Sequence, residues 1–288
     1  MLDAHPALSC PGESDFLFDH VQACDGSWRY DFAGLDMDRI YRASPMHMPE
    51  DADGTAALAQ MIAQVAQRKP GSRPVLVLHR HAEKALSILP NAQVIHLLRD
   101  PRDVARSVIG MGWAGNVFHG LEPWIETEDQ WTEAQSKRKC IVHELRYEQL
   151  VTEPENTLDT LCAFLGLTYD AAMLAYDTYS TYGKPDPKLT YQWRHKLAAR
   201  QIRQLEARLS SRLERANYTP SGLPPLKISA AELFWLRVQN MASTKIHSIR
   251  RYGFGNILQR KVARIAGLRR WEARAQARID QITVRYLK

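Results

Sequence analysis

The sequence has little cysteine and no long apolar run. Its four cysteines are scattered without a Cys-x-x-Cys pair, which argues against a zinc site or a disulfide framework and favours reduced thiols. No uninterrupted apolar stretch approaches the roughly 18 residues of a membrane-spanning helix, and no secretory signal is recognised. We therefore expect a cytoplasmic protein, with any membrane contact limited to the membrane surface.

The charge of the chain is unevenly distributed. The 288 residues carry a net charge of +6, and their 45% hydrophobic content is ordinary for a globular protein. Residues 223–288 contain 14 lysines and arginines against three acidic residues, which leaves +11 on this segment. A Pro-Ser-Gly-Leu-Pro-Pro stretch at 220–225 precedes it and is typical of a boundary. We predict one domain over 1–220 and a basic helical extension over 221–288.

Helical and apolar segments alternate through the first 165 residues. We predict helices at 51–68, 82–89, 124–139 and 154–165, and strands at 74–78, 93–98 and 140–145. Residues 11–49 show no clear periodicity, and we expect irregular structure on the substrate side, with one short helix. The alternation predicts an α/β fold with a doubly wound parallel sheet, whose ligands bind at the carboxyl ends of the strands.

The junction after the strand at 93–98 carries the main chemical signal. Arg99-Asp100-Pro101 ends the strand, and Pro101 suits the first position of a helix. Free N–H groups and the macrodipole at a helix N-terminus attract anions, and the guanidinium of Arg99 suits phosphate. The alternative is that the arginines of this junction pair with Asp100 and Asp103 and serve only the fold.

The motif Arg-Asp-Pro-Arg-Asp, with a serine eight residues after the first arginine, resembles the 3′-phosphate loop of sulfotransferases that use 3′-phosphoadenosine 5′-phosphosulfate (PAPS). The resemblance implies that Arg99 and Ser107 hold the 3′-phosphate of the donor. The segment Leu145-Arg-Tyr-Glu-Gln-Leu150 resembles the Tyr-Glu-Asp-Leu segment of the family, which implies that Tyr147 lies against the adenine.

The first residues resemble tyrosylprotein sulfotransferases in particular. Leu2-Asp-Ala-His-Pro6 followed by Gly12-Glu13 matches a segment whose glutamate is the catalytic base, which implies this role for Glu13. The family's preceding strand and Pro-Arg-Ser-Gly-Thr-Thr type loop, which grips the 5′-phosphosulfate, are absent from the sequence. We expect that the start lies further upstream; a genuine truncation would instead be inactive. The implied fold is a P-loop-like parallel sheet flanked by helices, without its first strand and phosphate loop.

The loop His79-Arg80-His81 lies where these enzymes carry a catalytic lysine, and no lysine is in register here. The resemblance implies that His79 or Arg80 neutralises charge on the bridging oxygen; a metal site at the two histidines is the weaker alternative. A late basic segment closes over the nucleotide in the family, which makes Arg194 and Lys196 candidate donor contacts. The alternative is that both belong to the solvated first turn of the next helix.

Residues Gly110–Gly115 match G-x-G-x-x-G. The dinucleotide-binding motif must follow a strand and open a helix, whereas this stretch follows a helix, so we expect a flexible loop in which Trp113 offers a stacking face.

The resemblance implies transfer of a sulfuryl group from PAPS, without a metal, to a hydroxyl of a protein tyrosine, a carbohydrate or a small molecule. Two alternatives stay open: a non-catalytic nucleotide- or membrane-binding protein of this fold, and a P-loop phosphotransferase. The second would need a Walker lysine motif, which is absent. For residues 223–288, the first interpretation is a helical extension that packs on the body with a solvated basic face. Docking on an anionic membrane surface or an acidic partner is the alternative, and nucleic acid is disfavoured.

Overall fold

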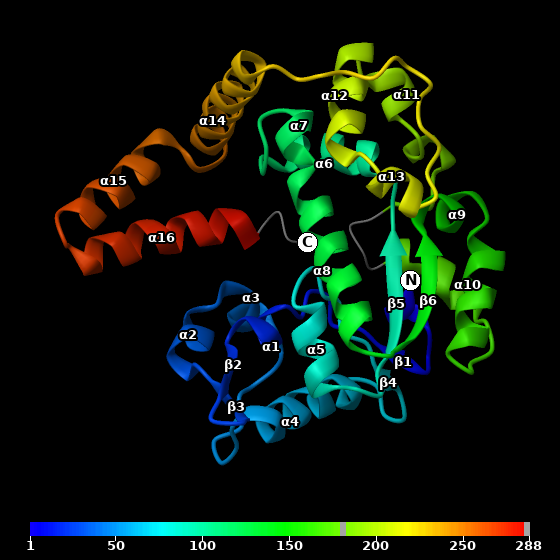
Figure 1. The fold of residues 1–288 in the computed structure, drawn as a ribbon. Helices are drawn as coiled ribbons and strands as arrows, with labels where there is room; N and C mark the ends of the chain where they lie inside the picture. Colours follow the sequence, from blue (N-terminus) through cyan, green and yellow to red (C-terminus); the bar gives the residue numbers. More distant parts are fainter. Residues whose placement is uncertain (179–182, 285–288) are drawn as a thin grey trace. The chain divides into compact units, whose positions relative to one another are not determined.

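The computed structural model describes residues 1–178 and 183–284 (Figure 1). The chain divides into two compact units, the first comprising residues 1–98 and 126–187 and the second comprising 99–125 and 188–288. The predicted boundary at 220–225 lies within the second unit and stays a prediction. The last four residues of the predicted extension, 285–288, lie outside the described residues.

The first unit is an α/β arrangement. Its strands are β1 (Leu8–Ser9), β2 (Val21–Cys24), β3 (Ser27–Tyr30), β4 (Arg73–Pro74), β5 (Gln93–Leu98) and β6 (Ile141–Arg146). Its helices are α1 (Phe16–Asp19), α2 (Phe32–Met37), α3 (Arg39–Ala43), α4 (Gly54–Gln67), α5 (Ala82–Ile88), α9 (Tyr147–Thr152), α10 (Pro154–Phe164) and most of α8 (Glu122–Lys137). Short 3₁₀ helices η1 (Leu2–Ala4), η2 (Ala171–Leu174) and η3 (Tyr176–Thr178) complete it.

The parallel strands are covered by helices, as the alternating pattern predicts. β1 pairs with β4 and β5 pairs with β6, both in parallel (Figure 1). Val94 and Val142 pack with Leu86 of α5 and Trp131 of α8. Because side chains alternate along a strand, the neighbouring Ile95 turns to the opposite face, where it packs against the core of α10. The α/β fold with a parallel sheet flanked by helices is therefore confirmed.

Two predicted segments are wrong in detail. The strand expected at 74–78 is limited to Arg73–Pro74, and Val77 makes only an isolated bridge to Glu13. The prolines at 11 and 74 have no N–H to extend this ladder. Residues 11–49 are more regular than expected, since β2 and β3 form an antiparallel hairpin. Its turn residues Asp25 and Gly26 both have positive φ, 49° and 78°, as the short turns of hairpins require.

The second unit is helical in its described part. It contains α6 (Pro101–Met111), α7 (Val117–Gly120), the start of α8, η4 (Pro187–Leu189) from Lys188 onward, α11 (Trp193–Lys196), α12 (Ala199–Leu209), α13 (Arg212–Arg215), α14 (Ala230–Tyr252), α15 (Phe254–Ile265) and α16 (Arg269–Val284). The last three lie within residues 221–288, and the division of these residues from the domain before them stays a prediction. Among residues 1–178 and 183–284, no helix combines the length and apolar character needed to cross a membrane.

Candidate functional site

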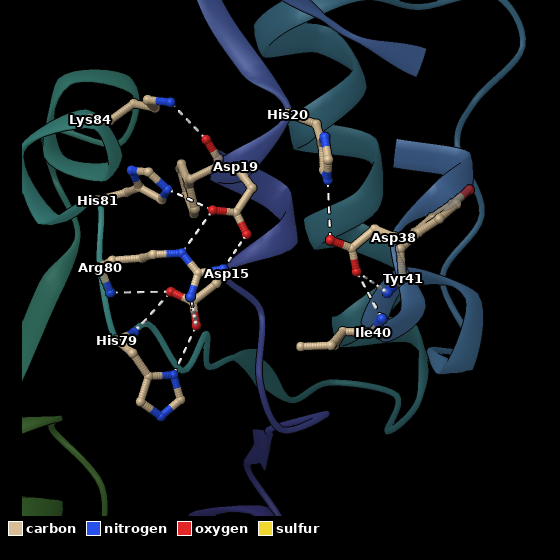
Figure 2. A network of polar contacts seen from close by, with 11 residues as sticks. Asp15, Asp19, His20, Asp38, Ile40, Tyr41, His79, Arg80, His81 and Lys84 are labelled. Atoms are coloured by element: carbon tan, nitrogen blue, oxygen red, sulfur yellow. Dashed lines mark hydrogen bonds and ion pairs between the residues drawn. The ribbon is translucent and has the colours of Figure 1, made fainter. Parts of the chain in front are cut away.

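In the first unit, the carboxylate of Asp15 holds His79 in place (Figure 2). One oxygen of Asp15 accepts hydrogen bonds from the backbone N–H groups of His79 and Arg80, at 2.9 and 3.1 Å, and the other lies 2.8 Å from Nδ1 of His79. A backbone hydrogen bond from Ser14 to Val77, beside the Glu13–Val77 bridge, brings the two segments together. The side chain of Asp15 is 2% exposed, whereas that of His79 is 58% exposed.

This contact changes the protonation of both groups. The hydrogen bond to Asp15 raises the pKa of His79 despite its partial burial, and the charges of Asp15 and Glu13 add to the increase. Burial by itself would raise the pKa of Asp15, but the hydrogen bonds from His79 outweigh it, and the pKa is lowered. Asp15 therefore favours an imidazolium at His79, and the negative charge of the exposed Glu13 carboxylate favours it further.

The two neighbours of His79 are engaged by a second carboxylate. Arg80 donates to Asp19 through Nε at 2.8 Å and also through Nη2, and Nε2 of His81 lies 2.7 Å from Asp19 (Figure 2). These contacts direct Arg80 and His81 toward α1. Within the described ranges, no group of three or more histidine, cysteine or acidic side chains is placed to hold a metal ion.

Tyr147, the candidate adenine contact, is the first residue of α9 and follows directly after β6. Its side chain is half-buried. It lies near Tyr176, whose pKa is raised by burial and, to a lesser degree, by Asp177 and Tyr147. An aromatic ring at the carboxyl end of a parallel strand lies where α/β folds bind ligands.

In the second unit, Arg99 and Ser107 lie before and within α6. Pro101 occupies the first turn of the helix, as predicted, and Asp100 caps it by accepting from the N–H of Arg102. Arg99 donates from Nη2 to the carbonyl of Leu189 at 3.1 Å, and its own carbonyl accepts from the indole of Trp124. Ser107 is partly buried in the second turn.

The second arginine of the motif, Arg102, is a structural residue. Its side chain is 1% exposed and forms a bidentate pair with Asp100, at 3.0 and 2.8 Å, and a bond of 2.7 Å to Glu206. Its guanidinium carbon also lies 3.7 Å from the ring centroid of Trp193. The alternative that an arginine of the junction serves the fold is thus correct for Arg102.

The late basic segment is tied to the start of α6 by the same network. The indole of Trp193 donates to Asp100 at 3.0 Å, and the backbone N–H of Trp193 donates to Asp103 at 2.8 Å. Arg194 and Lys196 are exposed on α11, which is separate from α12. The alternative that they belong to the first turn of the following helix is therefore wrong, while their contact with a donor stays a prediction.

The G-x-G-x-x-G stretch is a packing surface. Gly112 ends α6 with φ of 78°, and the N–H of Gly115 donates to the side chain of Asn240 on α14 at 2.6 Å. A Cβ on Gly115 would lie 2.6 Å from the carbonyl of Asn240, so only glycine allows this approach. Trp113 is exposed, as expected of a stacking face.

Three residues that organise these sites were not among the sequence-based candidates: Asp15, Arg102 and Trp193. Asp15 lies directly before α1, and no local pattern predicts its contact with His79, 64 residues away. The pairing of Arg102 with Asp100 is the structural alternative that the sequence offered at this junction. Nothing local predicts its contacts with Glu206 and Trp193, which lie far along the sequence.

Comparisons with known proteins show the family and the fold. A family model described as "Sulfotransferase family" matches residues 1–171. Protein-tyrosine sulfotransferase 2 from Gallus gallus is 26% identical over 196 residues, which cover 64% of this chain and 51% of that protein. The chain thus spans about half the length of this relative.

Two solved structures share the fold. The sulfotransferase domain from the curacin biosynthetic pathway has a TM-score of 0.51 at 18% identity, covering 77% of this chain and 92% of that chain. The sulfotransferase domain from the Synechococcus PCC 7002 olefin synthase has a TM-score of 0.50 at 20% identity, covering 78% of this chain and 89% of that chain. At these identities, the similarity shows the fold.

Proposed function

Because this chain belongs to the sulfotransferase family, we propose that it transfers a sulfuryl group from PAPS to an acceptor hydroxyl. The acceptor oxygen forms a bond to sulfur, the bond from sulfur to the bridging oxygen breaks, and 3′-phosphoadenosine 5′-phosphate leaves. The proton of the acceptor hydroxyl passes to a base of the enzyme. No metal takes part in this proposal.

The observation that carries the proposal is the strand–turn–helix junction after β5. Arg99 stands in the turn, Pro101 opens α6, and Asp100 and Arg102 hold the turn rigid. A helix N-terminus beside a guanidinium is an arrangement that favours anions, which supports the proposal. We assign the 3′-phosphate of the donor to Arg99 and Ser107, the adenine to Tyr147, and further contacts with its phosphates to Arg194 and Lys196.

The chemical step is assigned to Glu13 and His79. Glu13 is an exposed carboxylate, and in our proposal it takes the proton of the attacking hydroxyl. His79 has a raised pKa, caused first by its hydrogen bond to Asp15, so that it carries positive charge more readily. An imidazolium stabilises the negative charge that develops on the leaving oxygen, which is the task of the lysine that this chain lacks at the loop.

For the acceptor, we propose a tyrosine phenol as the first compound to test. The reason is the name of the Gallus gallus relative, a protein-tyrosine sulfotransferase. Carbohydrate hydroxyls and small phenols or alcohols are the other classes that the proposed chemistry accommodates, because each presents a hydroxyl nucleophile to the same base.

Calorimetric titration with 3′-phosphoadenosine 5′-phosphate tests the proposal. We expect binding by the wild-type chain and its loss in Arg99→Ala, with Arg39→Ala as control because Arg39 is exposed and far along the sequence from the junction. The titration is repeated with any in-frame residues encoded upstream added to the chain. Failure of both forms to bind the nucleotide would contradict the proposal.

A transfer assay separates the enzyme from the two rival functions. Incubation with sulfur-labelled PAPS and a tyrosine peptide, a glycan or a small phenol should label one acceptor class. Magnesium-dependent turnover of ATP without sulfuryl transfer would favour a phosphotransferase. Nucleotide binding without transfer to any of the three acceptors would favour a binding protein of this fold.

A further inference from the structure

An apolar stripe runs along α15 and has no cover among the described residues. Phe254, Leu258, Val262 and Ile265 are all exposed, and Ile265 reaches 77% exposure. At about 100° per residue, these four side chains lie between about 180° and 260° around the helix from Ala263, which is fully buried. The stripe therefore faces away from the buried side of α15.

The buried side of α15 packs against α16. The two helices lie side by side as a hairpin (Figure 1), with Ala263, Ala275 and Ile279 buried. Polar contacts tie their flanks together, including Arg264 to Glu272 at 2.8 Å and Arg260 to Gln276 at 3.0 Å. The hairpin thus has its own small core and does not need the outward stripe for its packing.

The tip of the hairpin continues the apolar surface. Leu268 lies between the two helices and is exposed, and Trp271, in the first turn of α16, is 53% exposed. A tryptophan and a phenylalanine at opposite ends of such a surface are typical of segments that insert shallowly at a lipid interface.

Cations border this surface. Residues 254–284 contain seven arginines and lysines against two acidic residues. Both acidic side chains have hydrogen-bond partners, since Glu272 accepts a hydrogen bond from Arg264 and Asp280 accepts one from Gln276. The exposed cations of the hairpin are Lys261, Arg264, Arg269, Arg270, Arg274 and Arg278.

We propose that the α15–α16 hairpin docks on an anionic lipid surface, with the apolar stripe in the interface and the cations at the headgroups. An anionic lipid surface binds segments in which apolar side chains are flanked by arginines and lysines. A second copy of the chain is disfavoured, because two surfaces of the same positive charge repel. Nucleic acid would use the cations but would leave the apolar stripe in water.

Sedimentation with lipid vesicles tests the proposal on the full chain. We expect the protein to pellet with phosphatidylcholine vesicles that contain about 30% phosphatidylserine, and to stay in solution with phosphatidylcholine alone. The double variant Leu258→Ser/Ile265→Ser removes exposed apolar groups, and Lys261→Glu/Arg270→Glu reverses exposed charges. Each should weaken binding by about tenfold or more, given about 1 kcal/mol for each surface cation and similar losses per apolar group.

Matched controls come from the first unit of the chain. Met37→Ser removes a side chain that is 75% exposed, and Arg39→Glu reverses an exposed charge. Neither should change vesicle binding, and circular dichroism should show unchanged helicity in all four variants. Absence of pelleting with the anionic vesicles would overturn the proposal. So would binding that high salt abolishes but Leu258→Ser/Ile265→Ser leaves intact, because that pattern marks a purely electrostatic partner such as an acidic protein.

Discussion

Asp15 and His79 lie 64 residues apart in the sequence, yet one carboxylate accepts both the backbone N–H and the imidazole of this histidine. The hydrogen bond from the backbone N–H of His79 positions the loop at 79–81, and the hydrogen bond at Nδ1 orients the imidazole ring. Nε2 is therefore the ring nitrogen available to a substrate. Such a carboxylate–imidazole pair sets tautomer, orientation and charge together.

Replacing Asp15 by asparagine should lower the pKa of His79 toward its ordinary value of 6.5, because the negative charge that favours the imidazolium is gone. NMR titration of the His79 ring in the wild type and in Asp15→Asn measures this change. The same measurement in the variant Asp38→Asn, which changes a carboxylate that contacts His20 rather than His79, serves as the control. An unchanged His79 pKa would show that Asp15 does not control this group.

The same pair predicts a pH window for stability. Because the pKa of His79 is raised, its contribution to folding stability is complete below pH 6.5. This contribution is lost as the pH rises through the raised pKa. Because the pKa of Asp15 is lowered, its contribution to folding stability is complete above pH 3.8. This contribution is lost as the pH falls through the lowered pKa. The destabilisation by Asp15→Asn should therefore be greatest between pH 3.8 and 6.5 and smaller at alkaline pH, at about 1 kcal/mol in urea unfolding because solvent screens the exposed imidazole. A difference that grows as the pH rises above 6.5 would contradict the pairing.

Replacing Glu13 by glutamine should reduce kcat by about 10²- to 10⁴-fold, because the amide cannot accept the proton of the acceptor. The KM for PAPS should stay nearly constant, in contrast to Arg99→Ala, which should raise it. Glu50→Gln is the matched control, since Glu50 is also an exposed glutamate. A fully active Glu13→Gln enzyme would remove Glu13 as the base.

Replacing Arg102 by methionine should lower the free energy of unfolding by about 3–5 kcal/mol. The buried Asp100 would lose its bidentate partner, and Glu206 would lose a bond of 2.7 Å. Denaturant unfolding measures the loss, and Arg39→Met, at an exposed position, should stay within about 0.5 kcal/mol of the wild type. Equal effects of the two variants would argue against a structural role for Arg102.

Replacing Gly115 by alanine should destabilise the chain by about 1–3 kcal/mol, because the new methyl group collides with the backbone of α14. Gly110→Ala is the matched control, since this glycine lies in α6 with open space around it and alanine is the better helix former. Thermal unfolding distinguishes the two. If Gly115→Ala were neutral, the glycines of this stretch would need an explanation other than packing.

The structure also shows where local signals succeed and fail. The strand at 93–98 and the helix from Pro101 were predictable, because an apolar run and a proline act on their own neighbours. The hairpin at 21–30 also depends on local sequence, because Asp25-Gly26 is a typical hairpin turn. The prediction of an irregular segment did not take this turn into account. The strand at 74–78 failed for another reason, since a strand needs a partner and β1 supplies only Leu8–Ser9.

The sequence by itself determined the alternation of strands and helices, the strand–turn–helix junction at Arg99, and the basic character of the last helices. These properties follow from the order of apolar, charged and helix-breaking residues along a short length of chain. Only the tertiary structure decided that Asp15 holds His79, that Arg102 rather than Arg99 is the buried arginine, and that Gly115 meets α14. The contacts of Asp15 with His79, Arg102 with Glu206 and Gly115 with Asn240 each join residues more than 60 positions apart. Burial and hydrogen bonding in the folded chain, and no local preference, select these partners.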